Sequence, residues 1–287
     1  MNKKKAVILG GGGRYGNSWE LGYLFGLEKA GISIRNADVI VGTSAGSKVG
    51  TLLSSDLNWK EIWEEQIEKA SNEDSPISNE DMNKLFKEYN EIALKSVSPK
   101  DWVIKMGEIS LKTPNIQDET SRISDIGKDL GSIKPVWPEQ LRIIVTNLER
   151  SERIVLSKDS NVDILEALAA STALPGVWRP VNIKGNYYYD GGSYSMENPD
   201  VVKDADIMLI LSTDLPIATP YKLDELIQKQ ENNGVKTKLI KPANEVREVL
   251  KSFNFNTMDQ KLRPLTALAG VRQGEKDAEQ IREFWEQ

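Results

Sequence analysis

The chain has 287 residues, a formal net charge of −6, and neither cysteine nor histidine. This length can bury one substantial core, with or without an appended helical lobe. The acidic balance argues against nucleic acid as a partner, because phosphate binding requires a concentrated basic surface. The missing residue types exclude thiol nucleophiles, disulfides and Ser-His-Asp triads, and neither a metal site nor a cofactor is expected. Acid–base chemistry must therefore come from Asp, Glu, Lys, Tyr or water.

The N-terminus carries three lysines, at positions 3–5, followed by a short apolar run at positions 6–9. Glycines then interrupt this run. It is too short for the apolar segment of a secretory signal and far too short to cross a bilayer. We therefore expect a cytoplasmic protein, and the absence of cysteine agrees with that location.

The first fifty residues predict a strand, a glycine-rich loop, a helix, a second strand, a sharp turn and a further helix. The run Lys5–Leu9 ends in four glycines, as is typical of a buried parallel strand. Residues 18–30 place apolar side chains on one face and predict a helix, and residues 38–41 predict the second strand. This strand–helix–strand unit favours a parallel sheet with right-handed crossovers.

The remainder of the chain predicts further sheet between two helical regions. Residues from about 56 to 134 are polar with helical apolar spacing and predict a helical insert. Residues 162–170 predict a helix, and residues from about 222 to 287 predict a helical C-terminal extension. The whole chain, 1–287, is expected to form one domain. Further strands are predicted at residues 141–145, 153–156, 187–189 and 207–212.

A candidate nucleophile lies between the second strand and the following helix, at Ser44. Its context, Gly42-Thr43-Ser44-Ala45-Gly46, is a G-x-S-x-G pattern. A serine on so tight a turn has a strained backbone, and small residues two positions away on either side avoid clashes. The pattern alone also fits a turn that caps a helix. The strand–turn–helix context favours the nucleophile, with its hydroxyl near a helix N-terminus that stabilises negative charge.

Glycines dominate residues 10–16, GGGGRYG. Successive glycines allow backbone N–H groups to turn toward an oxyanion. Gly11, Gly13 and Gly16 also match the G-x-G-x-x-G loop of dinucleotide-binding proteins. That alternative requires an acidic residue at the end of the second strand, but here this strand leads directly to Ser44.

Asp190 is the candidate base. It follows three tyrosines and precedes Gly191 and Gly192, a pattern that by itself is most often an Asp-Gly turn. Because the chain has no histidine, Ser44 still needs a proton acceptor. A free Asp side chain has a pKa near ~3.9, so burial should raise the pKa of Asp190 if it acts as a base. Its carboxylate should also lie within roughly 2.6–3.2 Å of the hydroxyl.

A fourth segment, residues 170–181 with the sequence ASTALPGVWRPV, predicts a helix end followed by a proline-restricted loop. Its small residues indicate close packing against another part of the fold. In order along the chain, GGGGRYG, GTSAGS, ASTALPGVWRPV and YYDGG resemble the signatures of the patatin-like phospholipases. The resemblance covers about residues 5 to 215.

This resemblance implies the α/β class, with a three-layer α/β/α arrangement around a mostly parallel central sheet, and a Ser-Asp dyad in place of a triad. It assigns Ser44 as the nucleophile and Asp190 as the general base. The family loop commonly has a basic residue where this chain has Tyr15, with Arg14 one position earlier. The resemblance also implies an oxyanion hole formed by the amides of Gly11, Gly12, Gly13 and Arg14. It further implies glycines that support the motifs, namely Gly16, Gly42, Gly46, Gly191 and Gly192.

The leading hypothesis is hydrolysis of fatty-acyl esters of phospholipids or related lipids through an acyl-serine intermediate. An acyltransferase with the same dyad is the first alternative, since the two differ only in whether water or an acceptor reaches the intermediate. A dinucleotide-binding Rossmann-type protein is the second. Without a polybasic run, any contact with a membrane surface should be transient. Four aromatic residues of the insert could line an acyl pocket or lid, although core packing is favoured for most of them: Trp59, Trp63, Phe86 and Trp102.

Overall fold

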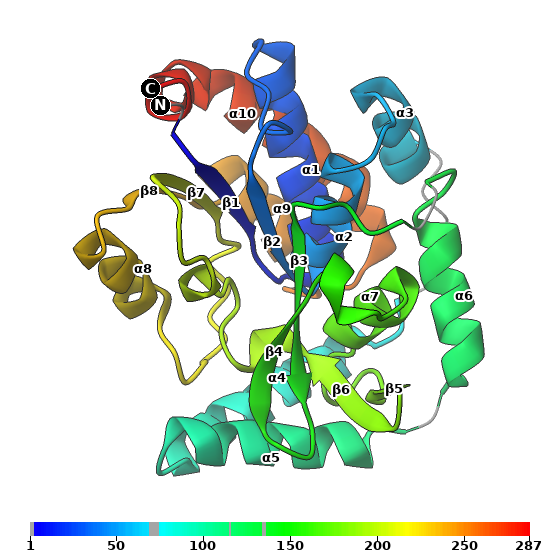
Figure 1. Ribbon diagram of the computed structural model, residues 1–287. Helices are drawn as coiled ribbons and strands as arrows, with labels where there is room; N and C mark the ends of the chain where they lie inside the picture. Colours follow the sequence, from blue (N-terminus) through cyan, green and yellow to red (C-terminus); the bar gives the residue numbers. More distant parts are fainter. Residues whose placement is uncertain (1–2, 69–74, 115, 134–135) are drawn as a thin grey trace.

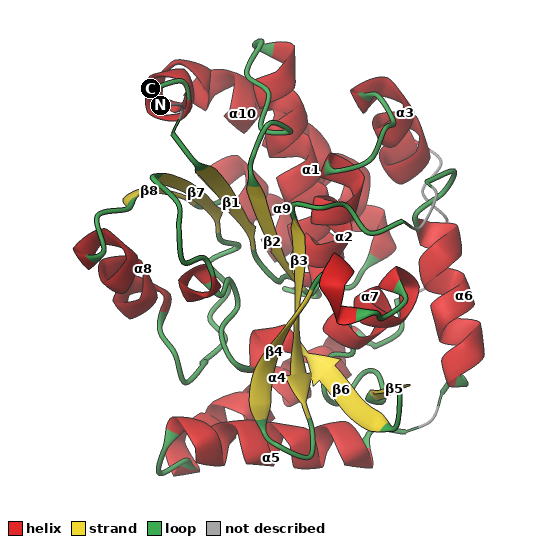
Figure 2. Ribbon diagram, in the orientation of Figure 1, coloured by secondary structure: helices red, strands yellow, loops and turns green. Residues whose placement is uncertain are grey.

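The computed structural model describes residues 3–68, 75–114, 116–133 and 136–287 (Figure 1). A mixed, mostly parallel sheet lies at the centre with helices on both faces (Figure 2), which confirms the predicted α/β class. The parallel strands are β1 (Lys5–Leu9), β2 (Val39–Thr43), β3 (Leu141–Asn147), β7 (Ile207–Leu211) and β8 (Lys236–Ile240). The antiparallel strands are β4 (Glu152–Leu156), β5 (Val181–Ile183) and β6 (Asn186–Asp190).

The strands lie in the order β5-β6-β3-β2-β1-β7-β8, and β4 also pairs with β3. Successive side chains of a strand point to opposite faces, so β1 contributes to two separate cores. Val7 and Leu9 pack on one face with the apolar side chains of α1 and α2. Ala6 and Ile8 pack on the other face, where Ile227 of α8 covers them. The sheet is therefore the middle layer of three.

The helices are α1 (Gly13–Lys29), α2 (Ala45–Leu53), α3 (Trp59–Trp63), α4 (Asn79–Lys95), α5 (Pro99–Lys112), α6 (Glu119–Asp129), α7 (Ile164–Ser171), α8 (Leu223–Asn232), α9 (Asn244–Ser252) and α10 (Arg263–Trp285).

The strand register brings the candidate nucleophile and the candidate base together. On one side of β3, Thr43 pairs with Ile144, so Ser44 follows at the level of Val145. On the other side of β3, Val145 pairs with Asp190 at the end of β6. Because β6 runs antiparallel to β3, its last residue points back toward the carboxyl end of β2. Ser44 and Asp190 therefore flank a single residue of the strand between them.

Two predictions for the regions outside the motifs need correction. The C-terminal region is not purely helical, because Lys236–Ile240 forms the edge strand β8, parallel to β7. Its alternating lysines conceal the strand, since an edge strand needs little apolar surface. The loop before β6 also contains the short strand β5, which pairs with β6 in a hairpin.

The predicted insert contains helices α3 to α6 together with a π-helical turn at Glu64–Glu68. Residues 69–74, 115 and 134 of this prediction lie outside the described residues. The division of one domain into core, insert and extension stays a prediction. Within the described ranges, no helix is long and apolar enough to cross a membrane. The expected cytoplasmic location stays a prediction as well.

Helix α10 packs on α1 with the two backbones in direct contact. A Cβ atom added at Gly26 of α1 would lie 2.3 Å from the carbonyl oxygen of Val271, and one added at Gly22 would lie 2.1 Å from that of Ala267. Such distances exclude any side chain without movement of a helix. Because α1 begins in the glycine-rich loop, this contact fixes the element that carries the loop.

We expect Gly26→Ala to lower the free energy of unfolding by about 1–3 kcal/mol or more, because the new methyl group must push α10 away. Gly127→Ala in α6 is the matched control. Its Cβ would meet its nearest neighbour, Leu165 Cδ1, at an ordinary 3.4 Å, so the gain in helix propensity should stabilise the protein by up to about 1 kcal/mol. Urea denaturation measures both changes. Equal stability of the two variants would contradict the backbone contact.

Candidate active site

Ser44 sits in a strained conformation on the turn between β2 and α2, with φ 51° and ψ −117°. Neighbouring segments leave no room for larger residues around it. A Cβ at Gly46 would lie 2.2 Å from the carbonyl oxygen of Leu9, and one at Gly42 would lie 2.5 Å from the Cα of Ser47. Positive φ at a non-glycine residue costs about 1–3 kcal/mol and persists only where the surroundings impose it.

Ser171 at the end of α7 connects this turn to β3, a role that the sequence analysis did not predict. Its buried hydroxyl donates to the carbonyl of Ile144 at 2.7 Å and accepts the backbone N–H of Ser44 at 3.0 Å. This contact explains the small residues of the ASTALP segment, since only a short side chain at the end of α7 fits between β3 and the turn. The serine within this segment could have indicated a polar contact. Its partner could not be predicted, because Ser44 lies 127 positions away in the sequence.

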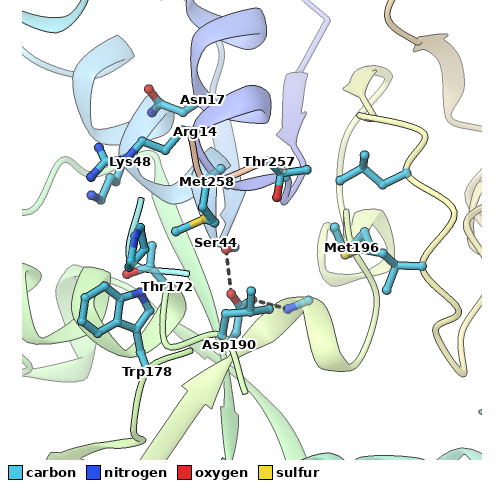
Figure 3. Close-up of a pocket in the computed structure, with 18 of the residues that line it drawn as sticks. Arg14, Asn17, Ser44, Lys48, Thr172, Trp178, Asp190, Met196, Thr257 and Met258 are labelled. Carbon is cyan, nitrogen blue, oxygen red and sulfur yellow. Dashed lines mark hydrogen bonds between the residues drawn. The ribbon is translucent and has the colours of Figure 1, made fainter. Parts of the chain in front are cut away.

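Asp190 accepts the hydroxyl of Ser44 at 2.7 Å through Oδ2, within the distance that proton transfer requires (Figure 3). Its other oxygen, Oδ1, accepts the backbone N–H of Gly192 at 2.8 Å. The residue is only 2% exposed. Both oxygens are therefore held, one by the glycine turn and the other by the serine.

Burial raises the pKa of Asp190 to about 6. The hydrogen bonds from Ser44 and from the Gly192 amide oppose this rise, and so does the positive charge of Arg122. At neutral pH the carboxylate is still mostly ionised, but it is a stronger base than a solvated aspartate. The site thus has a proton acceptor without an imidazole.

The glycine-rich loop divides into amides that are engaged and amides that are free. Gly10 donates to the carbonyl of Leu211 at 3.1 Å, and Gly11 donates to that of Met196 at 2.9 Å. The amides of Gly12, Gly13 and Arg14 have no acceptor among the described residues. The prediction that Gly11 supplies an oxyanion-hole amide therefore does not fit the structure, because its N–H is already bonded.

The three residues with free amides line the same cavity as Ser44. A Cβ built at Gly11 would lie 3.5 Å from the Cβ of Ser44, so the loop passes directly over the turn. Gly12 and Gly13 both have positive φ, 150° and 60°, which turns their peptide units away from the ordinary helical direction. Gly16 packs against the side chain of Thr213 and the backbone of Gly11, and its N–H donates to the carbonyl of Gly12 at 2.9 Å.

Ser44 and Asp190 line a cavity of about 250 Å³. Its apolar part is formed by side chains from the helical insert and from the segment after α7, including Phe86, Tyr89, Trp102, Met106, Leu174 and Trp178. Two of the four aromatic residues singled out in the insert, Phe86 and Trp102, therefore reach the cavity. The other two, Trp59 and Trp63, pack against Phe25 of α1.

The polar part of the cavity contains Arg14, Asn17, Lys48, Arg122 and Asp129. Tyr15 is buried in the core, and its N–H donates to the carbonyl of Thr257 at 3.0 Å. The basic residue of the loop thus reaches the cavity from position 14. No sequence pattern predicted that Lys48, Arg122 or Asp129 belongs to the site, because only the fold brings α2 and α6 to the same cavity.

A match to a family model agrees with this arrangement. A family model described as patatin-like phospholipase matches residues 7–202. VipD from Legionella pneumophila is similar in structure, with a TM-score of 0.45, 16% identity, and coverage of 97% of this chain and 67% of that one. The type III effector protein ExoU has a TM-score of 0.38, 17% identity, and coverage of 95% and 53%. The chain thus spans about two thirds of the first and half of the second. No curated protein matches the sequence.

Because the pKa of Asp190 is about 6 in the folded state and ~3.9 in an unfolded chain, its ionisation opposes folding. This loss of stability is absent below ~pH 3.9, grows as the pH rises, and is complete above ~pH 6. Asp190→Asn cannot ionise. The free energy of unfolding of Asp190→Asn minus that of the wild type should therefore be about 1.4 kcal/mol larger at pH 8 than at pH 5.

Urea denaturation at the two pH values measures this difference. The control is Asp204→Asn, which removes a carboxylate from a largely exposed residue that pairs with Lys4. A difference between Asp190→Asn and the wild type that is the same at both pH values would contradict a raised pKa.

Proposed function

Because the chain belongs to the patatin-like phospholipase family, we propose that it hydrolyses fatty-acyl esters of phospholipids or related lipids with Ser44 as nucleophile and Asp190 as general base. The single observation that carries this proposal is the 2.7 Å hydrogen bond from the Ser44 hydroxyl to a buried carboxylate. The strained turn, the free loop amides and the adjoining apolar cavity support it. A Ser-Asp pair of this kind needs no third residue, because the Gly192 amide orients the carboxylate.

Acylation begins with the ester carbonyl beside Ser44. The hydroxyl oxygen attacks the carbonyl carbon while its proton passes to Oδ2 of Asp190. Negative charge develops on the carbonyl oxygen, and the amides of Gly12, Gly13 and Arg14 are the donors available to stabilise it. Protonated Asp190 then returns the proton to the leaving alcohol as the tetrahedral intermediate collapses to an acyl-serine.

In deacylation, water takes the place of the Ser44 hydroxyl as nucleophile, and the serine oxygen becomes the leaving group. Asp190 accepts a proton from water, and the resulting hydroxide equivalent attacks the acyl-serine carbonyl. The same amides stabilise the second oxyanion, and the proton returns to the serine oxygen. Throughout both steps the acyl chain occupies the apolar part of the cavity, where Phe86, Trp102 and Met106 can remove it from water.

Removal of the Ser44 hydroxyl should stop turnover of a medium-chain p-nitrophenyl ester, and removal of the Asp190 carboxylate should slow it strongly. Ser44→Ala removes the nucleophile, so hydrolysis and labelling by a fluorophosphonate probe should both disappear. Asp190→Asn should lower kcat/KM by 10²–10⁴-fold, the usual contribution of a general base. Asp204→Asn is the matched control, with no expected change in rate. Hydrolysis by Ser44→Ala at the wild-type rate would refute the proposed nucleophile.

The rate should depend on pH through Asp190. Only the ionised carboxylate can accept the serine proton, so kcat/KM should rise with pH up to about 6 and level off above it. Below that value it should fall about tenfold per pH unit, because the fraction of ionised base falls in the same proportion. Initial rates between pH 4.5 and 8 with a neutral ester measure this. A profile without an inflection in that range would exclude Asp190 as the base.

A further inference from the structure

A buried acid lies against the glycine-rich loop and takes no part in the proton transfers described above. Glu20 belongs to the second turn of α1 and is fully buried. Its Oε1 accepts the N–H of Gly10, the first glycine of the loop, at 2.8 Å. Among the described residues, neither Glu20 nor Gly10 lines the cavity that contains Ser44. Any effect of Glu20 on the reaction must therefore pass through the loop.

The need to satisfy backbone groups does not account for this carboxyl group. The N–H of Gly10 also donates to the carbonyl of Leu211 at 3.1 Å, so it has an acceptor without Glu20. The other oxygen of Glu20, Oε2, is buried with no hydrogen-bond partner in the part of the chain that the structure describes. An unpartnered polar atom in the core lowers stability. The carboxyl group therefore does not serve the stability of the core.

The surroundings of Glu20 favour its neutral form. Burial raises the pKa of Glu20 well above its usual range; the hydrogen bond from Gly10 opposes this rise and the negative charge of Glu197 adds to it. Burial also raises the pKa of Glu197, to about 7. A neutral carboxyl group accepts the N–H of Gly10 through its carbonyl oxygen. It does so without placing a full negative charge close to the loop that must stabilise an oxyanion.

The first two glycines of the loop connect it to the other two segments of the site. The carbonyl of Gly10 accepts the N–H of Gly46, in the turn after β2, at 3.0 Å. The N–H of Gly11 donates to the carbonyl of Met196, in the segment that follows Asp190, at 2.9 Å. The free amides begin with the next residue of the loop. A shift of Gly10 would therefore move the oxyanion donors relative to both the nucleophile and the base.

We propose that Glu20 is a positioning residue for the oxyanion hole, because its carboxyl group fixes the first peptide of the glycine-rich loop and so aligns the free amides before the substrate binds. This inference rests on the proposed hydrolase function. Aligned donors stabilise the charge that develops on the carbonyl oxygen in the transition state more than they stabilise the bound ester. Loss of Glu20 should therefore lower kcat and leave KM nearly unchanged.

The test compares two substitutions at Glu20. Methionine has a similar size but offers no comparable acceptor to Gly10. With Glu20→Met, kcat for a medium-chain p-nitrophenyl ester should fall about tenfold, less than the loss of about 10²–10³-fold that follows removal of an oxyanion donor itself. The midpoint of urea unfolding should stay the same or rise, because the unpartnered oxygen is gone. Glu20→Gln keeps an acceptor for Gly10 and should restore kcat.

Gln273→Met is the matched control. Gln273 of α10 also holds α1 through a buried hydrogen bond, which it accepts from Trp19 Nε1 at 3.0 Å. Its replacement should lower the midpoint of urea unfolding and leave kcat as it is. Opposite effects of Glu20→Met and Gln273→Met on rate and stability distinguish alignment of the loop from general support of α1.

Labelling by a fluorophosphonate probe gives a second readout that needs no ester. The Ser44 oxygen forms a bond to phosphorus, its proton passes to Asp190, and fluoride leaves with the electrons of the P–F bond. The phosphoryl oxygen takes the place of the oxyanion in this reaction. The rate constant for labelling should therefore fall in Glu20→Met by a factor similar to the fall in kcat.

Three results would overturn the proposal: wild-type kcat in Glu20→Met, equal losses in Glu20→Met and Glu20→Gln, or failure of Glu20→Met to fold. In the last case the carboxyl group would serve the fold itself. Ester hydrolysis by the wild type that does not depend on Ser44 would instead remove the proposed function.

Discussion

The position of one strand determines the chemistry of this molecule. Strand β3 lies between β2 and β6, and Val145 separates the turn that carries Ser44 from the carboxylate of Asp190. Because the neighbours of a strand lie at a fixed spacing on either side of it, the serine and the aspartate meet without any flexible linker. A slip of one residue in either register would move one of them to the opposite face. Backbone pairing thus brings the Ser44 and Asp190 side chains within hydrogen-bond distance of each other.

Burial of Asp190 links stability and reactivity. The environment that raises its pKa also makes its charged form unfavourable in the folded protein, so the rest of the fold must offset that cost. The strained backbone at Ser44 also lowers the stability of the folded protein. Neighbouring groups restrain both features, since Ser171 holds the turn and the Gly192 amide holds the carboxylate. Reactive geometry here is maintained by contacts that do not take part in proton transfer.

Local patterns identified the motifs of the site, because each depends on residues next to one another in the chain. The strand before Ser44, the glycines around it and the turn after Asp190 all belong to this group. The roles of Ser171 and Arg122 could not be inferred, since their partners are brought near only by the fold. The state of each loop amide was hidden for the same reason, as the acceptor of Gly11 is the distant Met196. Strand β8 was missed because its lysines obscure the apolar pattern that marks inner strands.

The contact between α1 and α10 joins two segments that lie more than 200 residues apart in the sequence. The helix that begins in the glycine-rich loop is packed backbone to backbone against residues 263–285. During synthesis, the motifs of the first fifty residues emerge long before their support exists, since a chain is made from its N-terminus. The glycine-rich loop therefore gains the packing support of α10 only after α10 has been made and has docked on α1.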